Sequence, residues 1–240
     1  MTVSAAGRGT RKGVRVGLWI GGALLLVLVL AQVLLPLVAE KIAKDRLSAY
    51  GTVESVSVSA WPAVELLWGK ADRASVRMGS LRVSASELPK VVEQIWEARG
   101  VQNVTMSAAQ VEVGATGLLA RGVSASDLRV EKRGAQLSET ATLTQRQLEE
   151  ALPSGFRVQL LESAAGQVRV QVSGGFFGLQ AAIEASIKPV EGRLVVEPQG
   201  LPFATLTLLS ASHLRVESVA MTVIRSRPLT YRLSVRASLR

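Results

Sequence analysis

The sequence contains no cysteine and a single histidine, His213. Without cysteine there are no disulfides and no thiol chemistry, and one histidine cannot supply the common zinc sites or the usual nucleophile arrangements. GxSxG, Walker, GxGxxG and HExxH motifs are also missing. Acidic residues fall singly on the polar faces of expected strands, or together only in helices, so no pair of catalytic carboxylates is indicated. We therefore expect no enzyme, no metal site and no cofactor.

Aromatic residues make up only 4% of the chain, which leaves few rings on which nucleic-acid bases could stack. The net charge of +9 does not indicate a nucleic acid either. Residues 1–46 hold seven Lys/Arg and two Asp/Glu and so supply +5 of it, in a part of the chain where basic residues set membrane topology. A second basic strip lies in residues 215–240, and it either faces anionic lipid headgroups or forms a solvated strand face. Its candidate headgroup-facing residues are Arg225, Arg227, Arg232 and Arg236.

One apolar run, residues 16–39, carries no charge, and roughly 20 such residues are enough for a helix to cross a membrane. The basic residues 1–15 precede it, so the positive-inside rule predicts a cytoplasmic tail, a single-pass anchor and an extracytoplasmic domain over residues 40–240. A cleaved signal peptide is the alternative. Gly17 and Gly21 form one GxxxG motif, which leaves a weak homodimer open.

In most of the remaining chain, apolar and polar residues alternate with a period of two. This pattern is typical of antiparallel strands with one face covered by the protein and the other exposed to water. In residues 167–172, valines alternate with Gln and Arg. After Gly79 and Ser80 the parity of the alternation flips, which predicts a bulge or a tight turn. Similar patterns predict strands over residues 52–60, 71–84, 101–113, 123–131, 156–162, 179–188, 212–226 and 229–239.

Few helices are expected. Residues 87–100 have Pro89 in the first turn and Gly100 at the end, and a capping box from Thr144 to Gln147 begins a second helix that Pro153 stops. Residues 201–213 fit a short helix or a strand. Because these helices offer much less apolar surface than the strands, the sheet must close on itself, pack against another sheet or bind an apolar ligand. The fold class is α+β, mainly β.

Three segments carry a family resemblance. The first is a strand "VESVSVSA", then Trp61-Pro62, a short apolar turn "AVELL", Gly69 and a second strand "ADRASVRM". The others are "ATLTQRQLEEAL" and "LPFATLTLLSASHLRVESVAMTV". In this order the chain resembles the LmeA-like phospholipid-binding family of the bacterial cell envelope over roughly residues 40–240, although Trp61 and Ala63 replace the phenylalanines usual in the family.

The resemblance implies a half-tubular lipid-binding fold, in which a long curled antiparallel sheet wraps around a helix and encloses an apolar groove for acyl chains. A membrane-anchored, non-enzymatic protein that binds phospholipid or glycolipid for presentation or transfer is the leading hypothesis. The alternative is a ligand-free envelope scaffold whose two sheets pack as a closed β-sandwich, and an enzyme comes third. Candidate lipid-binding residues, at the lining or the rim, are Trp61, Leu66, Leu67, Trp68, Val92, Ile95, Trp96, Phe176, Phe177 and Leu179.

Overall fold

The structure is a computed structural model that describes residues 31–32, 34–84, 87, 100–114, 122–176, 179–200 and 205–239. The predicted anchor, residues 16–39, lies for the most part outside these residues, as do Gly17 and Gly21. None of the helices in the described segments is long and apolar enough to cross a membrane.

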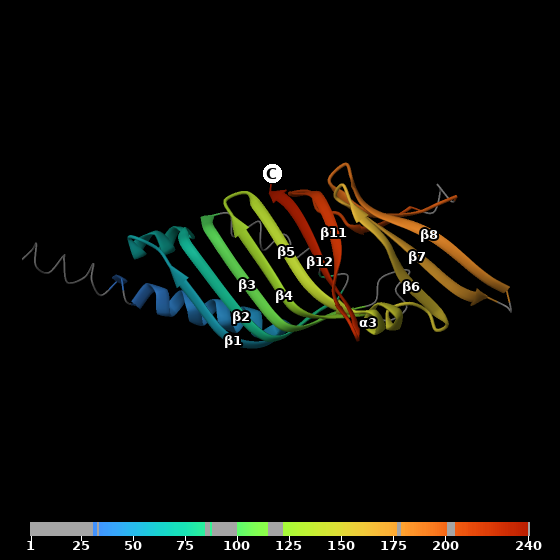
Figure 1. The fold of residues 1–240 in the computed structure, drawn as a ribbon. Helices are drawn as coiled ribbons and strands as arrows, with labels where there is room; N and C mark the ends of the chain where they lie inside the picture. The colour runs from blue at the N-terminus through green and yellow to red at the C-terminus, as the bar shows by residue number, and fades with distance from the viewer. Residues whose placement is uncertain are drawn as a thin grey trace, which may run out of the picture.

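The described chain forms two β-sheets with little helix, so the expectation of a mainly β, α+β fold is confirmed (Figure 1). The seven-stranded sheet has the order β1-β2-β3-β4-β5-β12-β11, and the five-stranded sheet has the order β10-β9-β8-β7-β6. The bounds are η1 Ser48–Tyr50, β1 Gly51–Ser59, η2 Ala63–Trp68, β2 Ala71–Val83, β3 Val101–Val113, β4 Val123–Arg133, β5 Gln136–Thr144, α3 Gln145–Glu150, β6 Phe156–Ala164, β7 Gln167–Phe176, β8 Leu179–Val190, β9 Arg193–Pro198, β10 Leu206–Leu209, β11 Leu214–Ser226 and β12 Leu229–Leu239.

The seven-stranded sheet is mixed, which corrects the expectation of a wholly antiparallel one. β2 and β3 run parallel, with Ala71 opposite Val101 and Val83 opposite Val113. The other neighbouring strands of both sheets are antiparallel. Alternation shows which residues of a strand share a face, but it does not show whether two strands pair in parallel or antiparallel. The chain between residues 84 and 100 is long enough for the crossover connection that a parallel pair requires.

Sequence patterns missed two strands and left a third open. β5 and β9 were not predicted, because β5 carries Glu139 in the same parity as its leucines and β9 is short and not strictly alternating. Within residues 201–213, Leu206–Leu209 form strand β10, so this part of the segment is not a helix. The capping box of α3 is confirmed: the Thr144 hydroxyl accepts from the Gln147 amide at 3.2 Å, and Gln147 Oε1 accepts from the Thr144 amide at 2.8 Å.

The parity flip at Gly79 is a bulge, as predicted. Thr52 pairs with Ser80 and Val53 with Met78, so Gly79 is the extra residue on β2. A second register shift lies between Ser126 and Arg129 in the β4–β5 pairing, whereas the β2–β3 and β3–β4 pairings between the two shifts keep their register. Within that shift Asp127 has φ 50°, in the left-handed region that Asp tolerates better than most residues. A bulge bends the strand that carries it, so local bends are expected at both positions.

Two apolar clusters cover one face of the seven-stranded sheet. The first lies on β2 to β5 and includes Met78, Ala108 and Leu128. The second joins the two sheets, with Val168 and Val170 from β7 packed near Val219 on β11. Side chains of the five-stranded sheet pack against β11 and β12, whereas the first cluster contains no residue of that sheet, so sheet-on-sheet packing in the described chain is limited to the β11–β12 end.

The second sheet also protects the free edge of β11. The Val219 amide donates to the Gly166 carbonyl at 2.9 Å, and the Val216 amide donates to the Gly192 carbonyl at 2.8 Å. Both acceptors lie in hairpin turns, where Gly166 and Gly192 have positive φ angles of 76° and 81°. These turns therefore satisfy backbone groups that an open edge would leave to water.

Candidate functional site

The two tryptophans near residue 65 lie in a turn that is firmly attached to its surroundings. η2 connects β1 to β2, and the Trp61-Pro62 peptide bond is cis. The Trp61 amide donates to Asp72 Oδ2 at 2.8 Å, and the amide of the buried Ala63 donates to Gln32 Oε1 at 3.0 Å. Gly69 ends η2 with φ 67°, a conformation that glycine adopts without strain. The turn is thus bonded both to β2 and to the helix before β1.

The side chains of this turn project into solvent. Trp61 is 76% exposed, Trp68 69% and Leu67 66%, whereas Leu66 is partly buried. The helical residues 34–47 lie at the same end of the molecule (Figure 1), joined to β1 by the Val58 amide, which donates to Glu40 Oε1 at 3.2 Å. We call the exposed apolar side chains of this region the apolar end: Leu34, Leu37, Val38, Ile42, Trp61, Leu67 and Trp68.

The predicted lipid-binding residues do not all come together. Phe176 and Leu179 form the last pair of the β7–β8 ladder, at the opposite end of the molecule from η2 (Figure 1). Val92, Ile95, Trp96 and Phe177 lie outside the described residues. The structure therefore unites Trp61, Leu66, Leu67 and Trp68, and lipid contact by the whole set stays a prediction.

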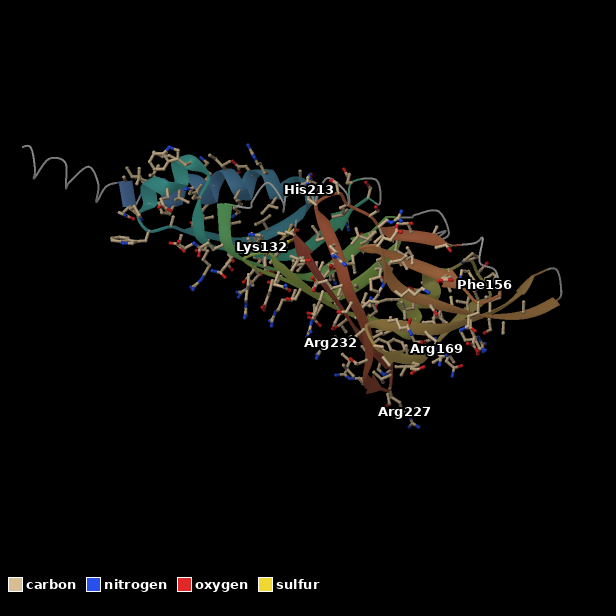
Figure 2. The ribbon with its side chains drawn as sticks, turned by 90° about the horizontal axis from the view of Figure 1, so that it is seen from above. Lys132, Phe156, Arg169, His213, Arg227 and Arg232 are labelled. Carbon is tan, nitrogen blue, oxygen red and sulfur yellow. The ribbon has the colours of Figure 1, made fainter. Side chains whose placement is uncertain are left out.

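The predicted basic residues occupy two places. Arg225 and Arg227 are exposed at the turn between β11 and β12, whereas Arg232 and Arg236 are exposed on the polar face of β12. Figure 2 shows Arg227 at the tip of this hairpin and Arg232 further along β12. The C-terminal arginines are therefore not a single strip.

Two ionisable side chains interrupt the apolar face. Lys132 is buried and donates from its ammonium group to the Val101 carbonyl, and burial lowers the pKa of Lys132. Glu139 is flanked by Val130 on β4 and Val235 on β12, and burial raises the pKa of its carboxyl group. Sequence reasoning missed Glu139, although its parity with Leu137 and Ala141 would have placed it on this face had β5 been recognised.

Two hollows formed by described residues bear on the site. One, of about 580 Å³, lies at the ends of β2, β3 and β4, where Arg82 pairs with Glu112 at 2.9 Å. The other, of about 600 Å³, lies on the polar face of the seven-stranded sheet and includes Arg232. Neither is lined by the predicted acyl-contact residues, and no cluster of three His, Cys, Asp or Glu that could hold a metal occurs within the described segments.

Comparison with known families gives one match. The family model described as LmeA-like phospholipid-binding matches residues 29–231, which covers the η2 turn, the five-stranded sheet and the seven-stranded sheet except most of β12. The chain belongs to the LmeA-like phospholipid-binding family. Comparisons with curated proteins and with solved structures give no match. For this LmeA-like chain, the family assigns lipid binding as the general function and phospholipid as the class of partner, and it is not an enzyme family.

Proposed function

We propose that this LmeA-like protein is held in the cell membrane by residues 16–39, and that its domain on the extracytoplasmic side takes acyl chains of phospholipid or glycolipid into an apolar groove. Binding, presentation or transfer of envelope lipids would follow without a chemical step. The observation that carries the proposal is the apolar end: its Leu34, Leu37 and Val38 are the last part of the uncharged apolar run, and its other side chains follow that run in the sequence.

The composition of the apolar end suits the boundary between lipid and water. Trp61 and Trp68 each combine a wide apolar ring with an indole N–H, and such side chains gather at membrane interfaces. The helical residues 34–42 present four exposed apolar side chains with helical spacing, and three of these four belong to the apolar run, so the run contributes directly to the apolar end. Exposure of this many neighbouring apolar side chains is unusual for a surface that meets only water.

The apolar face of the seven-stranded sheet supports the second part of the proposal, the binding of acyl chains. Val76, Met106 and Val130 are only partly buried on this face, beside the first apolar cluster. Transfer of acyl chains from water to such a surface contributes about 0.8 kcal/mol per methylene. A chain lying along the partly covered side chains would therefore be bound mainly by the hydrophobic effect.

The proposal is tested with the full chain in a neutral maltoside micelle, by lipid extraction with mass spectrometry and by uptake of a fluorescent acyl probe. Met106→Gln places an amide on the apolar face, and uptake is expected to fall because burial of a polar group opposes chain binding. Thr105→Gln is the matched control, since Thr105 is the exposed neighbour on the other face of β3. Met106→Leu should retain uptake, which separates a binding defect from loss of packing.

Recovery of no lipid from the wild-type protein, together with no uptake of the probe, would contradict acyl binding. That result would instead favour a ligand-free scaffold of the envelope. Equal uptake by the Met106→Gln and Thr105→Gln variants would show that the chains bind elsewhere.

A further inference from the structure

The polar face of the seven-stranded sheet contains a hollow that the proposed lipid groove does not use. Its volume is about 600 Å³, and it lies near the register shifts at Gly79 and Asp127. Residues from β1, β2, β3, β4, β5 and β12 line it, so it is a feature of the whole sheet rather than of one loop. Six of the lining side chains carry the argument: Arg77, Ser107, Arg129, Thr140, Thr142 and Arg232.

Strand pairing arranges these residues in an alternating pattern. Ser107 on β3 lies opposite Arg77 on one side and Arg129 on the other. These two arginines are therefore two strand spacings apart, about 10 Å, which long side chains can bridge from both sides. On the other side of Arg129, β5 carries Thr140 and Thr142. Thr142 lies opposite Arg232 on β12, which is the third arginine of the hollow. Arg232 projects from the polar face in Figure 2.

The three arginines of the hollow are exposed, and within the described part of the chain they form neither an ion pair nor a hydrogen bond. Some other strand arginines are paired instead. Arg82 pairs with Glu112 at 2.9 Å, and Arg133 pairs with Glu131 at 3.0 Å. The guanidinium donors of the hollow are thus available to a ligand, and guanidinium matches the oxygens of phosphate better than ammonium does.

The lining also contains two carboxylates, Glu54 and Asp127, which leave a net charge of +1. Glu54 lies over the bulge, where its Oε1 is 3.2 Å from the position of a Cβ built on Gly79. The carboxylates limit the charge of the hollow, so a single compact anion suits it better than a highly charged polymer. The neighbouring hydroxyls of Ser107, Thr140 and Thr142 add neutral hydrogen-bond donors.

We propose that this hollow binds an anion of the phosphate class, with Arg77, Arg129 and Arg232 as its charged ligands. Met78, Ala108 and Leu128 also border the hollow, but they alternate along their strands with Arg77, Ser107 and Arg129 and belong to the apolar cluster. The proposed ligands therefore lie on the face opposite that cluster, and the site does not depend on the proposed lipid function. The anion is supplied either by a free phosphate compound or by the headgroup of a lipid in a membrane facing this side. A solvated arginine surface without a specific ligand is the competing interpretation.

The test is titration of the full chain, in a neutral maltoside micelle, with inorganic pyrophosphate, followed through the arginine Nε–H resonances and by calorimetry. The triple variant Arg77→Gln, Arg129→Gln, Arg232→Gln removes the proposed ligands. The control Arg73→Gln, Arg133→Gln, Arg236→Gln removes the same charge from the same three strands, four residues from each ligand and outside the lining.

The affinity for pyrophosphate is expected to fall at least about tenfold in the first triple variant, because charge-assisted hydrogen bonds are lost. In the control it should fall less than about threefold, because the charges removed lie outside the hollow and are screened, and the Arg133–Glu131 pair that is also lost lies at the exposed surface. A triple Arg→Lys variant at the three ligand positions keeps the charge and the fold but loses the planar fork, and it should still bind more weakly than wild type.

Equal losses in the two glutamine variants, or no saturable binding by the wild-type protein, would overturn the proposal. The source of the anion is decided by nanodiscs of neutral phosphatidylcholine with and without phosphatidylglycerol. If nanodiscs reduce pyrophosphate binding only when they contain phosphatidylglycerol, the natural anion is a lipid headgroup. If neither kind of nanodisc changes pyrophosphate binding, the natural anion is a free phosphate compound.

Discussion

Val219 and Val223 lie on the same strand, β11. Replacing each with alanine measures how much the packing between the two sheets contributes to the free energy of unfolding. Val219 is 1% exposed in the cluster between the sheets, whereas Val223 is 50% exposed beyond it. Val→Ala removes two methyl groups, worth about 0.8 kcal/mol each when buried, and the cavity left behind raises the cost to about 2–3 kcal/mol at Val219. At Val223 the same change should cost less than about 0.5 kcal/mol.

For a domain of this size, about 2–3 kcal/mol corresponds to a fall in Tm of roughly 5–10 °C. Thermal unfolding of both variants, followed by circular dichroism on the full chain in a neutral micelle, measures the difference. If the five-stranded sheet is attached through the Val168 and Val219 contact, Val219→Ala alone lowers Tm. Equal Tm values for the two variants, or a loss below about 1 kcal/mol at Val219, would refute the inferred packing.

Three further predictions follow from other parts of the molecule. Alanine at both Trp61 and Trp68 should reduce acyl-probe uptake more than it lowers Tm, because exposed indoles add little to folding; a large fall in Tm with normal uptake would instead assign them to packing. Burial raises the pKa of Glu139 from its ordinary value of 4.5, so the folded state retains this proton to higher pH than the unfolded chain, and stability falls as pH rises from about 4.5 through the raised pKa. Glu139→Gln should therefore increase Tm at pH 7 but hardly at pH 4, and a Tm difference that does not change with pH contradicts burial of the carboxylate. Thr144→Ala should cost about 1 kcal/mol through loss of the α3 cap, whereas Thr144→Ser should cost much less; equal costs in unfolding experiments would show that the cap is not formed.

Much of the strand pattern could be predicted because it depends on the order of apolar and polar residues within each strand. The valines of residues 167–172 alternate with polar residues, and the structure makes them β7. The shift at Gly79 is visible as a change of parity, and it is a bulge in the pairing of β1 with β2. The Thr144 cap was predictable because the bonds of a capping box join residues only three positions apart.

Other features depend on partners far away in the sequence. β12, near the end of the chain, inserts between β5 and β11, and β2 pairs in parallel with β3. Both arrangements are decided by which apolar faces can be buried together, which alternation within one strand does not specify. Glu139 was missed for a related reason, since its position on the apolar face follows from its neighbours Val130 and Val235 on other strands.

The candidate sites divide in the same way. Trp61, Leu67 and Trp68 were predicted as a group because they share one short turn, and the structure keeps them together and exposed. Phe176 and Leu179 were grouped with them by composition alone, and the fold carries them to the opposite end of the molecule. Lipid contact by any of these residues remains a prediction.

By itself, the sequence determined the apolar run, the period-two strands and the resemblance to a lipid-binding family that the family match confirms. Only the tertiary structure decided that Arg77, Arg129 and Arg232 surround one hollow, because they lie on β2, β4 and β12 and are far apart along the chain. The physical reason is that period two is a property of a single strand, whereas a site across a sheet depends on register between strands, and backbone pairing sets that register at long range.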